Sequence, residues 1–126
     1  MRIIGVDLHT RQQTVAMWDK ETGELIEKTL QHDGDEVRKF YSALPGQVLV
    51  GIEATGAMHW FLELLEELGI AHQVGHPSKI RKAETRKQKH DWRDAALLLK
   101  LQVENRFPSI WMLSTELRTL LMHRHQ

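Results

Sequence analysis

An aspartate inside an apolar strand is the first residue with evident chemistry in this chain. Asp7 stands in the run Ile3-Ile4-Gly5-Val6-Asp7-Leu8, which otherwise has the character of a buried β-strand. Aspartate is uncommon in strands, and a buried carboxylate without a partner is costly or becomes protonated. Alternation places Gly5 on the same face as Asp7, which leaves room for a close approach beside the acid. A divalent cation is the simplest partner, because Mg²⁺ and Mn²⁺ prefer oxygen ligands.

Three further acids stand where they can join Asp7. Glu53 follows the continuously apolar run 48–52, and Asp91 and Asp94 are three residues apart. A helix places residues at that spacing on one face. If the helix begins near the ends of the two strands, the four carboxylates can hold two ions about 4 Å apart, one at each reacting oxygen of a phosphodiester transfer. The candidate catalytic and metal-binding residues are therefore Asp7, Glu53, Asp91 and Asp94.

Each of these acids also has a structural explanation when it is taken alone. Asp91 can cap the helix, with Asp94 stabilising the helix dipole at its N-terminal end. Glu53 can be a solvated strand end, and Asp7 can accept hydrogen bonds from the polar turn at residues 9–12. The set of four, in the order strand, strand end and helix, is more specific than any member.

A basic stretch lies around the two helix acids. It holds seven of the 17 lysines and arginines of the chain: Lys79, Arg81, Lys82, Arg86, Lys87, Lys89 and Arg93. Such a cluster beside an acidic metal site suits a nucleic acid, because the cations neutralise backbone phosphates while the metals take the scissile one. The alternative is a solvated helix face with no partner.

The chain has eight histidines, and they are scattered. They do not show the paired spacing with a nearby acid that is typical of a zinc enzyme. His9 and His90 each lie within two residues of a candidate acid, so one of them can contact substrate or metal. Three tryptophans, Trp18, Trp60 and Trp111, are expected in the core.

The composition limits the class of protein. A chain of 126 residues fits one domain with a real core, and 17 basic residues balance 17 acidic ones, so net charge indicates no partner. The absence of cysteine excludes disulfides and thiolate metal sites, and it fits a reducing compartment. We find no signal peptide and no apolar run near the roughly 20 residues that cross a bilayer. We therefore expect a cytoplasmic protein.

The hydrophobic periodicity predicts an α/β fold. Three strands with short turns predict an antiparallel meander, and the later strands are apolar throughout, as is typical of parallel pairing. In chain order the predicted elements are strands at 3–8, 14–18 and 25–30, a helix at 33–44, a strand at 48–52, a helix at 57–68 capped by Thr55, a strand at 70–74, a short basic helix from 78, and an amphipathic helix from 91 to about 103. This order is that of the ribonuclease-H-like architecture, a five-stranded mixed sheet with flanking helices, in which the fourth strand lies beside the first.

Four short motifs at these positions resemble a known family. They are Gly5-Val6-Asp7, Ile52–Gly56, His76-Pro77 and Lys89–Ala95. In this order and spacing they resemble the DEDD transposases, bacterial insertion-sequence recombinases related to the Piv-type DNA invertases. The N-terminal domain of that family is similar to the RuvC resolvase, so the resemblance implies a RuvC-like fold. It covers almost the whole chain.

The resemblance also implies a reaction and partners. The four acids would bind Mg²⁺ or Mn²⁺ as two ions, and the protein would cut and rejoin element-end and target DNA as a homo-oligomer in the bacterial cytoplasm. Many members are guided by a structured RNA from the element. Two positions depart from the family pattern, since many relatives have Lys in place of Thr10 and Thr in place of His90.

Family members carry a second domain that supplies a serine nucleophile. We therefore expect residues 1–107 to form the catalytic domain and residues 108–126 to begin a helix that leads to that second domain. Ser114 lies in the wrong context for the nucleophile. On this interpretation the chain is a fragment that folds but does not complete recombination alone.

Three other functions fit parts of the pattern. A RuvC-type structure-selective endonuclease would use the same acids with water as the nucleophile. A non-catalytic nucleic-acid-binding module would need the basic stretch alone. A kinase domain of the actin and sugar-kinase type would use residues 5–10 as a phosphate loop, but that fold expects glycine at the position of His9 and a second nucleotide-binding half.

Overall fold

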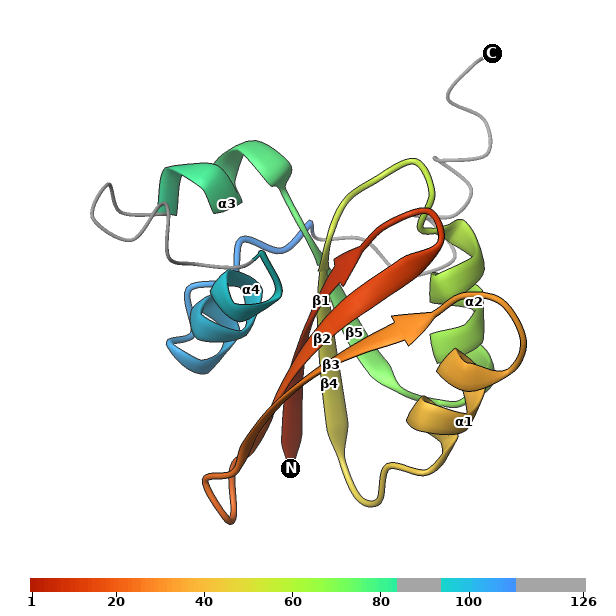
Figure 1. Ribbon diagram of the computed structural model, residues 1–126. Helices are drawn as coiled ribbons and strands as arrows, with labels where there is room; N and C mark the ends of the chain where they lie inside the picture. The colour runs from red at the N-terminus through yellow and green to blue at the C-terminus, as the bar shows by residue number, and fades with distance from the viewer. Residues whose placement is uncertain (84–93, 111–126) are drawn as a thin grey trace.

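The computed structural model describes residues 1–83 and 94–110, and a five-stranded mixed sheet is its central feature (Figure 1). The strands lie in the order β3-β2-β1-β4-β5. β2 pairs antiparallel with β1 and β3, whereas β4 pairs parallel with β1 and β5. The strands are β1 (Arg2–Leu8), β2 (Gln12–Asp19), β3 (Leu25–Gln31), β4 (Val48–Glu53) and β5 (Ala71–Gly75). This topology confirms the predicted ribonuclease-H-like fold, with the fourth strand beside the first.

Helices cover both faces of the sheet (Figure 1). α1 and α2 pack on one face, and α4 packs on the other with α3 beside it. The helices are α1 (Glu36–Ser42), α2 (His59–Glu67), α3 (Pro77–Ala83) and α4 (Asp94–Val103). None of these four helices has the length and apolar character needed to cross a membrane.

Alternation along β1 divides its side chains between the two faces, as the sequence predicts. Ile4 and Val6 are almost completely buried in the core under α1 and α2. Ile3 points the other way and packs with Ala95 and Leu99 of α4. Because the side-chain period of a strand is two residues, Gly5 and Asp7 share the α4 face with Ile3.

Two glycines let α4 lie directly on the sheet. Gly5 and Gly51 are partners in the parallel register of β1 and β4. A Cβ atom added to Gly5 would lie against the carbonyl oxygen of Ala95 and 2.6 Å from the backbone nitrogen of Leu99. One added to Gly51 would lie 2.6 Å from the side chain of Gln102. The missing side chains are therefore what permits the close approach of the helix.

The start of α2 differs from the prediction. The helix begins at His59, its N-cap is Met58, and no side-chain cap hydrogen bond is formed. Thr55 is therefore wrong as the cap. Its backbone carbonyl accepts a hydrogen bond from the Met58 N–H at 3.3 Å, so a turn at residues 55–58 separates Glu53 from the helix.

α4 is buried on two sides, so the prediction of an amphipathic helix is wrong. On its second side, three leucines of α4 pack in one cluster with Ile80 of α3 and Phe107. The three leucines are Leu97, Leu98 and Leu101. The prediction fails because the covering residues come from other segments of the chain.

The predicted core position of Trp60 is also wrong. Its side chain is 40% exposed, and its ring lies edge-on to that of His32 at a centroid distance of 4.7 Å.

The described chain ends beside β5. The N–H of His76 donates to the carbonyl of Pro108 at 3.0 Å, and the N–H of Ile110 donates to that of Val74 at 2.7 Å. These bonds cover the edge of β5 and hold the start of α3. The predicted division between residues 1–107 and 108–126 stays a prediction.

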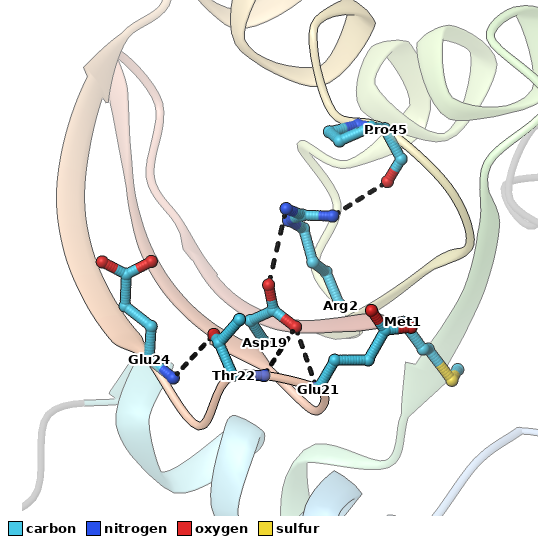
Figure 2. A network of polar contacts seen from close by, with 7 residues as sticks. All are labelled: Met1, Arg2, Asp19, Glu21, Thr22, Glu24 and Pro45. Atoms are coloured by element: carbon cyan, nitrogen blue, oxygen red, sulfur yellow. Dashed lines mark hydrogen bonds and ion pairs between the residues drawn. The ribbon is translucent and has the colours of Figure 1, made fainter.

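Asp19 organises the hairpin between β2 and β3 (Figure 2). Its Oδ1 accepts hydrogen bonds from the N–H groups of Glu21 at 2.9 Å and Thr22 at 3.4 Å. Its Oδ2 lies 3.5 Å from the guanidinium of Arg2, which also donates to the carbonyl of Pro45 at 3.0 Å. The bond from Glu21 is the main reason that the pKa of Asp19 is lowered.

A methyl group at Gly5 tests the contact with α4. Gly5→Ala should lower the free energy of unfolding by about 1–3 kcal/mol, the usual cost of overpacking, because the groups it meets belong to the helix backbone. Gly51→Ala should cost less, since the flexible side chain of Gln102 can move aside. Urea unfolding of both variants measures the difference, and equal losses would contradict the close helix approach.

The contribution of Asp19 to the stability of the folded protein should depend on pH. Because its pKa is lowered in the folded state, its charge stabilises the protein above the unfolded pKa of about 3.9, and this contribution is lost as the pH falls through the folded pKa. Asp19→Asn should therefore be less stable than the parent chain at neutral pH, and the gap should close below pH about 3.9. Thermal melts across this range provide the measurement, with Glu24→Gln in the same hairpin as the control. A gap that persists at low pH would contradict the charge effect.

Candidate metal centre

Asp7 and Glu53 lie side by side at one end of the sheet. The parallel register of β1 and β4 runs to the pair Val6 and Ile52, and the two acids are the next residues of these neighbouring strands. Their side chains are 23% and 28% exposed, so both are half-buried. Parallel pairing thus brings together two carboxylates that are far apart in sequence.

The two acids line an open cleft of about 320 Å³. Its other walls come from four segments, namely the end of β1, the turn after β4, α3 and α4. The residues that line it are Val6, Asp7, Leu8, Glu53, Ala54, Thr55, Pro77, Arg81 and Leu98. Thr55 was predicted as a helix cap and not as a site residue, although its position two residues after Glu53 is a signal that it lies at the site.

Asp94 brings a third negative charge to this end of the sheet. It is the first residue of α4 and is exposed. Burial raises the pKa of Glu53 above its ordinary value, and the negative charges of Asp94 and Asp7 raise it further. The guanidinium of Arg81 opposes them and lowers the pKa. Three of the four predicted acids therefore interact electrostatically although they come from three different elements.

Two cationic or polar side chains contact the acids in this structure. The His9 Nε2 atom lies 2.9 Å from Asp7 Oδ2, and an Arg81 guanidinium nitrogen lies 3.8 Å from Glu53 Oε1. The hydrogen bond between Asp7 and the polar turn, considered above as a structural alternative, is thus present. The side chains of His9 and Arg81 are 56% and 76% exposed, so either can move without disturbing the core.

The donor chemistry of the cleft fits a divalent cation. Carboxylate oxygens are the ligands that Mg²⁺ and Mn²⁺ prefer. Burial is the main reason that the pKa of Glu53 is raised, and the negative charges of Asp94 and Asp7 add to it. A cation bound beside Glu53 would favour its ionised form. Within residues 1–83 and 94–110, no three His, Cys, Asp or Glu side chains are grouped closely enough to hold a metal ion. The fourth predicted ligand, Asp91, lies outside the described residues.

The basic stretch is described only in part. Lys79, Arg81 and Lys82 lie on α3, where all three are exposed while Ile80 between them is buried. Only Arg81 of these three lines the cleft. The remaining basic residues of the stretch and the second candidate histidine lie outside the described residues: Arg86, Lys87, Lys89, His90 and Arg93.

Comparison with known proteins adds a family to this geometry. The family model of the IS110-type DEDD transposases, described as a transposase, matches residues 4–126. No curated protein matches the chain. Among solved structures, T. thermophilus RuvC in complex with Holliday junction substrate is similar, with 15% identity and a TM-score of 0.45 over 98% of this chain and 92% of that one. Because the family model spans nearly all of the sequence, the chain belongs to the IS110-type DEDD transposases.

Proposed function

We propose that this chain is the metal-dependent catalytic domain of a transposase that cuts and rejoins the DNA of a mobile element. The observation that carries the proposal is the position of Asp7 and Glu53 side by side in one cleft. The negative charges of Asp94 and Asp7 add to the effect of burial in raising the pKa of Glu53. Membership of the transposase family supports the reaction class. In this proposal residues 1–107 form the catalytic domain.

The acids would hold the metal. Asp7, Glu53, Asp94 and Asp91 are the proposed ligands of Mg²⁺ or Mn²⁺, bound as two ions. When bound, the ions would neutralise the negative charge that develops on the scissile phosphate and on the attacking and leaving oxygens. The half-buried setting of Asp7 and Glu53 strengthens their electrostatic attraction for such cations relative to fully solvated acids.

The cations at the rim would hold the nucleic acid. Lys79 and Lys82 are exposed on α3, the helix that carries Arg81, and suit backbone phosphates of a nucleic acid bound at the cleft. Arg81 lies inside the cleft, and its planar guanidinium suits a phosphate oxygen pair at the acids. Arg81 pairs with Glu53 in this structure. Once a metal ion binds to Glu53, the Arg81 side chain would be free to bind the phosphate.

The partners in this proposal are element-end and target DNA together with a structured guide RNA. The protein would act as a homo-oligomer, as the family resemblance implies. These partners follow from the family resemblance and from the basic side chains at the cleft. A RuvC-type endonuclease would use the same acids, and it differs by releasing hydrolysed DNA without joining it.

Conservative neutralisation of the acids tests the metal site. Asp7→Asn, Glu53→Gln, Asp91→Asn and Asp94→Asn should each weaken Mn²⁺ binding by more than about tenfold, because each removes a charged oxygen ligand. Isothermal titration calorimetry measures the affinity. Glu67→Gln is the matched control, since Glu67 pairs with Arg38 on the opposite face and should not affect binding. Unchanged affinity in Asp7→Asn and Glu53→Gln would refute the metal site.

Two basic side chains of α3, Arg81 and Lys82, should have different effects when they are replaced. The slope of log K against log salt concentration measures the number of phosphate contacts in duplex binding. Lys82→Gln and Arg81→Gln should each reduce the magnitude of this slope by about 0.9, because each removes one phosphate contact. Only Arg81→Gln should also raise the pKa of Glu53, because the guanidinium lowers it in the parent chain. Fluorescence anisotropy across a salt series and carboxyl-carbon NMR titration measure the two effects. An equal shift of the Glu53 pKa in Lys82→Gln would contradict the special position of Arg81.

A further inference from the structure

His32 contacts the turn between β1 and β2 at two consecutive carbonyls. It follows β3 directly and is half-buried. Its backbone N–H donates to the carbonyl of Arg11 at 2.8 Å, and its ring Nδ1 lies 3.1 Å from the carbonyl of Thr10. Its ring Nε2 lies 3.3 Å from the side-chain nitrogen of Gln13. One residue therefore holds this turn through both its backbone and its side chain.

The partners of the ring determine its tautomer. The carbonyl oxygen of Thr10 can only accept, so Nδ1 must carry a proton. The amide nitrogen of Gln13 can only donate, so Nε2 must present its lone pair. Both contacts are satisfied only by the neutral ring protonated at Nδ1.

A buried tyrosine contacts the other end of the Gln13 amide. The Tyr41 hydroxyl donates to Gln13 Oε1 at 2.7 Å, and both side chains are almost completely buried. Burial raises the pKa of Tyr41 well above its ordinary value, so the hydroxyl keeps its proton. The donors therefore all point one way, from Tyr41 through Gln13 and His32 to Thr10, and hydrogen bonds aligned in this way strengthen one another.

The same turn carries the histidine that contacts the first acid. The backbone N–H of His9 donates to the carbonyl of Gln12 at 2.9 Å, which closes the turn. The side chain of His9 then reaches Asp7 Oδ2 at 2.9 Å. The Gln13 side chain lies in the core under α1 and α2, whereas Asp7 faces α4. Among the residues that the structure describes, the turn is what links His32 to Asp7.

α2 also reaches His32, by way of Trp60. The two rings lie edge to face, with planes at 70°. Because α2 follows Glu53 after a short connection, His32 lies between the segments that leave both acid strands.

We propose that His32 is a positioning residue of the carboxylate cleft. As the neutral tautomer protonated at Nδ1, it fixes the carbonyl of Thr10 and so sets the place of His9 against Asp7. Metal affinity can test this role only if the proposed function is right. The tautomer of His32 and the geometry of the turn test it independently of the proposed function.

The tautomer gives the first test. Long-range proton–nitrogen NMR of the 126-residue chain, labelled with ¹⁵N at histidine, identifies which ring nitrogen of His32 carries the proton. We expect the proton at Nδ1 alone at neutral pH. A ring protonated at Nε2, or at both nitrogens, would overturn the proposal, and this measurement needs no variant to fold.

Three substitutions separate the donor from the rest of the ring. His32→Asn keeps an N–H donor near the position of Nδ1, His32→Gln places its amide near the position of Nε2, and His32→Ala has neither. His72→Ala is the matched control, because His72 Nδ1 also lies 2.9 Å from a carbonyl, that of Ile70, at the opposite end of the sheet. Circular dichroism checks that each variant folds.

The readouts are the amide resonances of His9 and Thr10 and the carboxyl carbon of Asp7. We expect His32→Gln and His32→Ala to shift all three, and His32→Asn and His72→Ala to leave them in place. The proposal is overturned if His32→Ala leaves the His9 and Asp7 resonances unchanged, or if His72→Ala shifts them equally.

Mn²⁺ affinity adds a functional readout. Partners one step behind a metal ligand typically contribute about 10- to 100-fold to affinity, and His32 is a further step away, so we expect a loss of about 3- to 10-fold in His32→Ala and His32→Gln. His32→Asn should stay within about twofold of the parent chain, because it keeps the donor. If the parent chain binds no Mn²⁺, the proposed function fails, while the His9 and Asp7 resonances still decide the role of His32.

Discussion

The close contact between α4 and the paired glycines of β1 and β4 is the constraint on which the site depends. Gly5 and Gly51 present backbone where other residues would present side chains, so the helix lies on the strands themselves. Asp94 begins that helix, and its charge therefore reaches Glu53 at the strand end. A larger residue at Gly5 would push away the element that brings the third acid.

Each of the two strand-end acids has a partner close by in the chain's fold. Asp7 and Glu53 are half-buried, and each contacts an exposed partner, His9 or Arg81, that is free of the core. This arrangement tolerates the acids while leaving their partners able to move. In the proposed function a phosphate would replace the exposed contact of Arg81 with Glu53, which leaves the core unchanged.

The two faces of the sheet carry different groups of side chains. The face under α1 and α2 holds the larger core and the polar chain from Tyr41 to His32, whereas the face under α4 carries the acids. The turn after β1 joins them, because its carbonyls are held from one face and its histidine reaches the other. Packing on one side can therefore affect the geometry of the acids on the other.

Local patterns in the sequence were enough to predict the strands, their order and the pairing of Asp7 with Glu53, because alternation and turn residues act over a few positions. Three predictions were wrong: Thr55 as the helix cap, Trp60 in the core, and one side of α4 as exposed. In each case the outcome depends on packing between segments that are distant in sequence.

The sequence by itself thus determined which acids can meet, since it sets where each strand and helix begins. Only the tertiary structure decided what surrounds them: Arg81 beside Glu53, His9 on Asp7, and His32 behind the turn. These contacts join residues from separate elements. They depend on the crossing of α4 over the sheet and on the register of the strands, which no short stretch of sequence specifies.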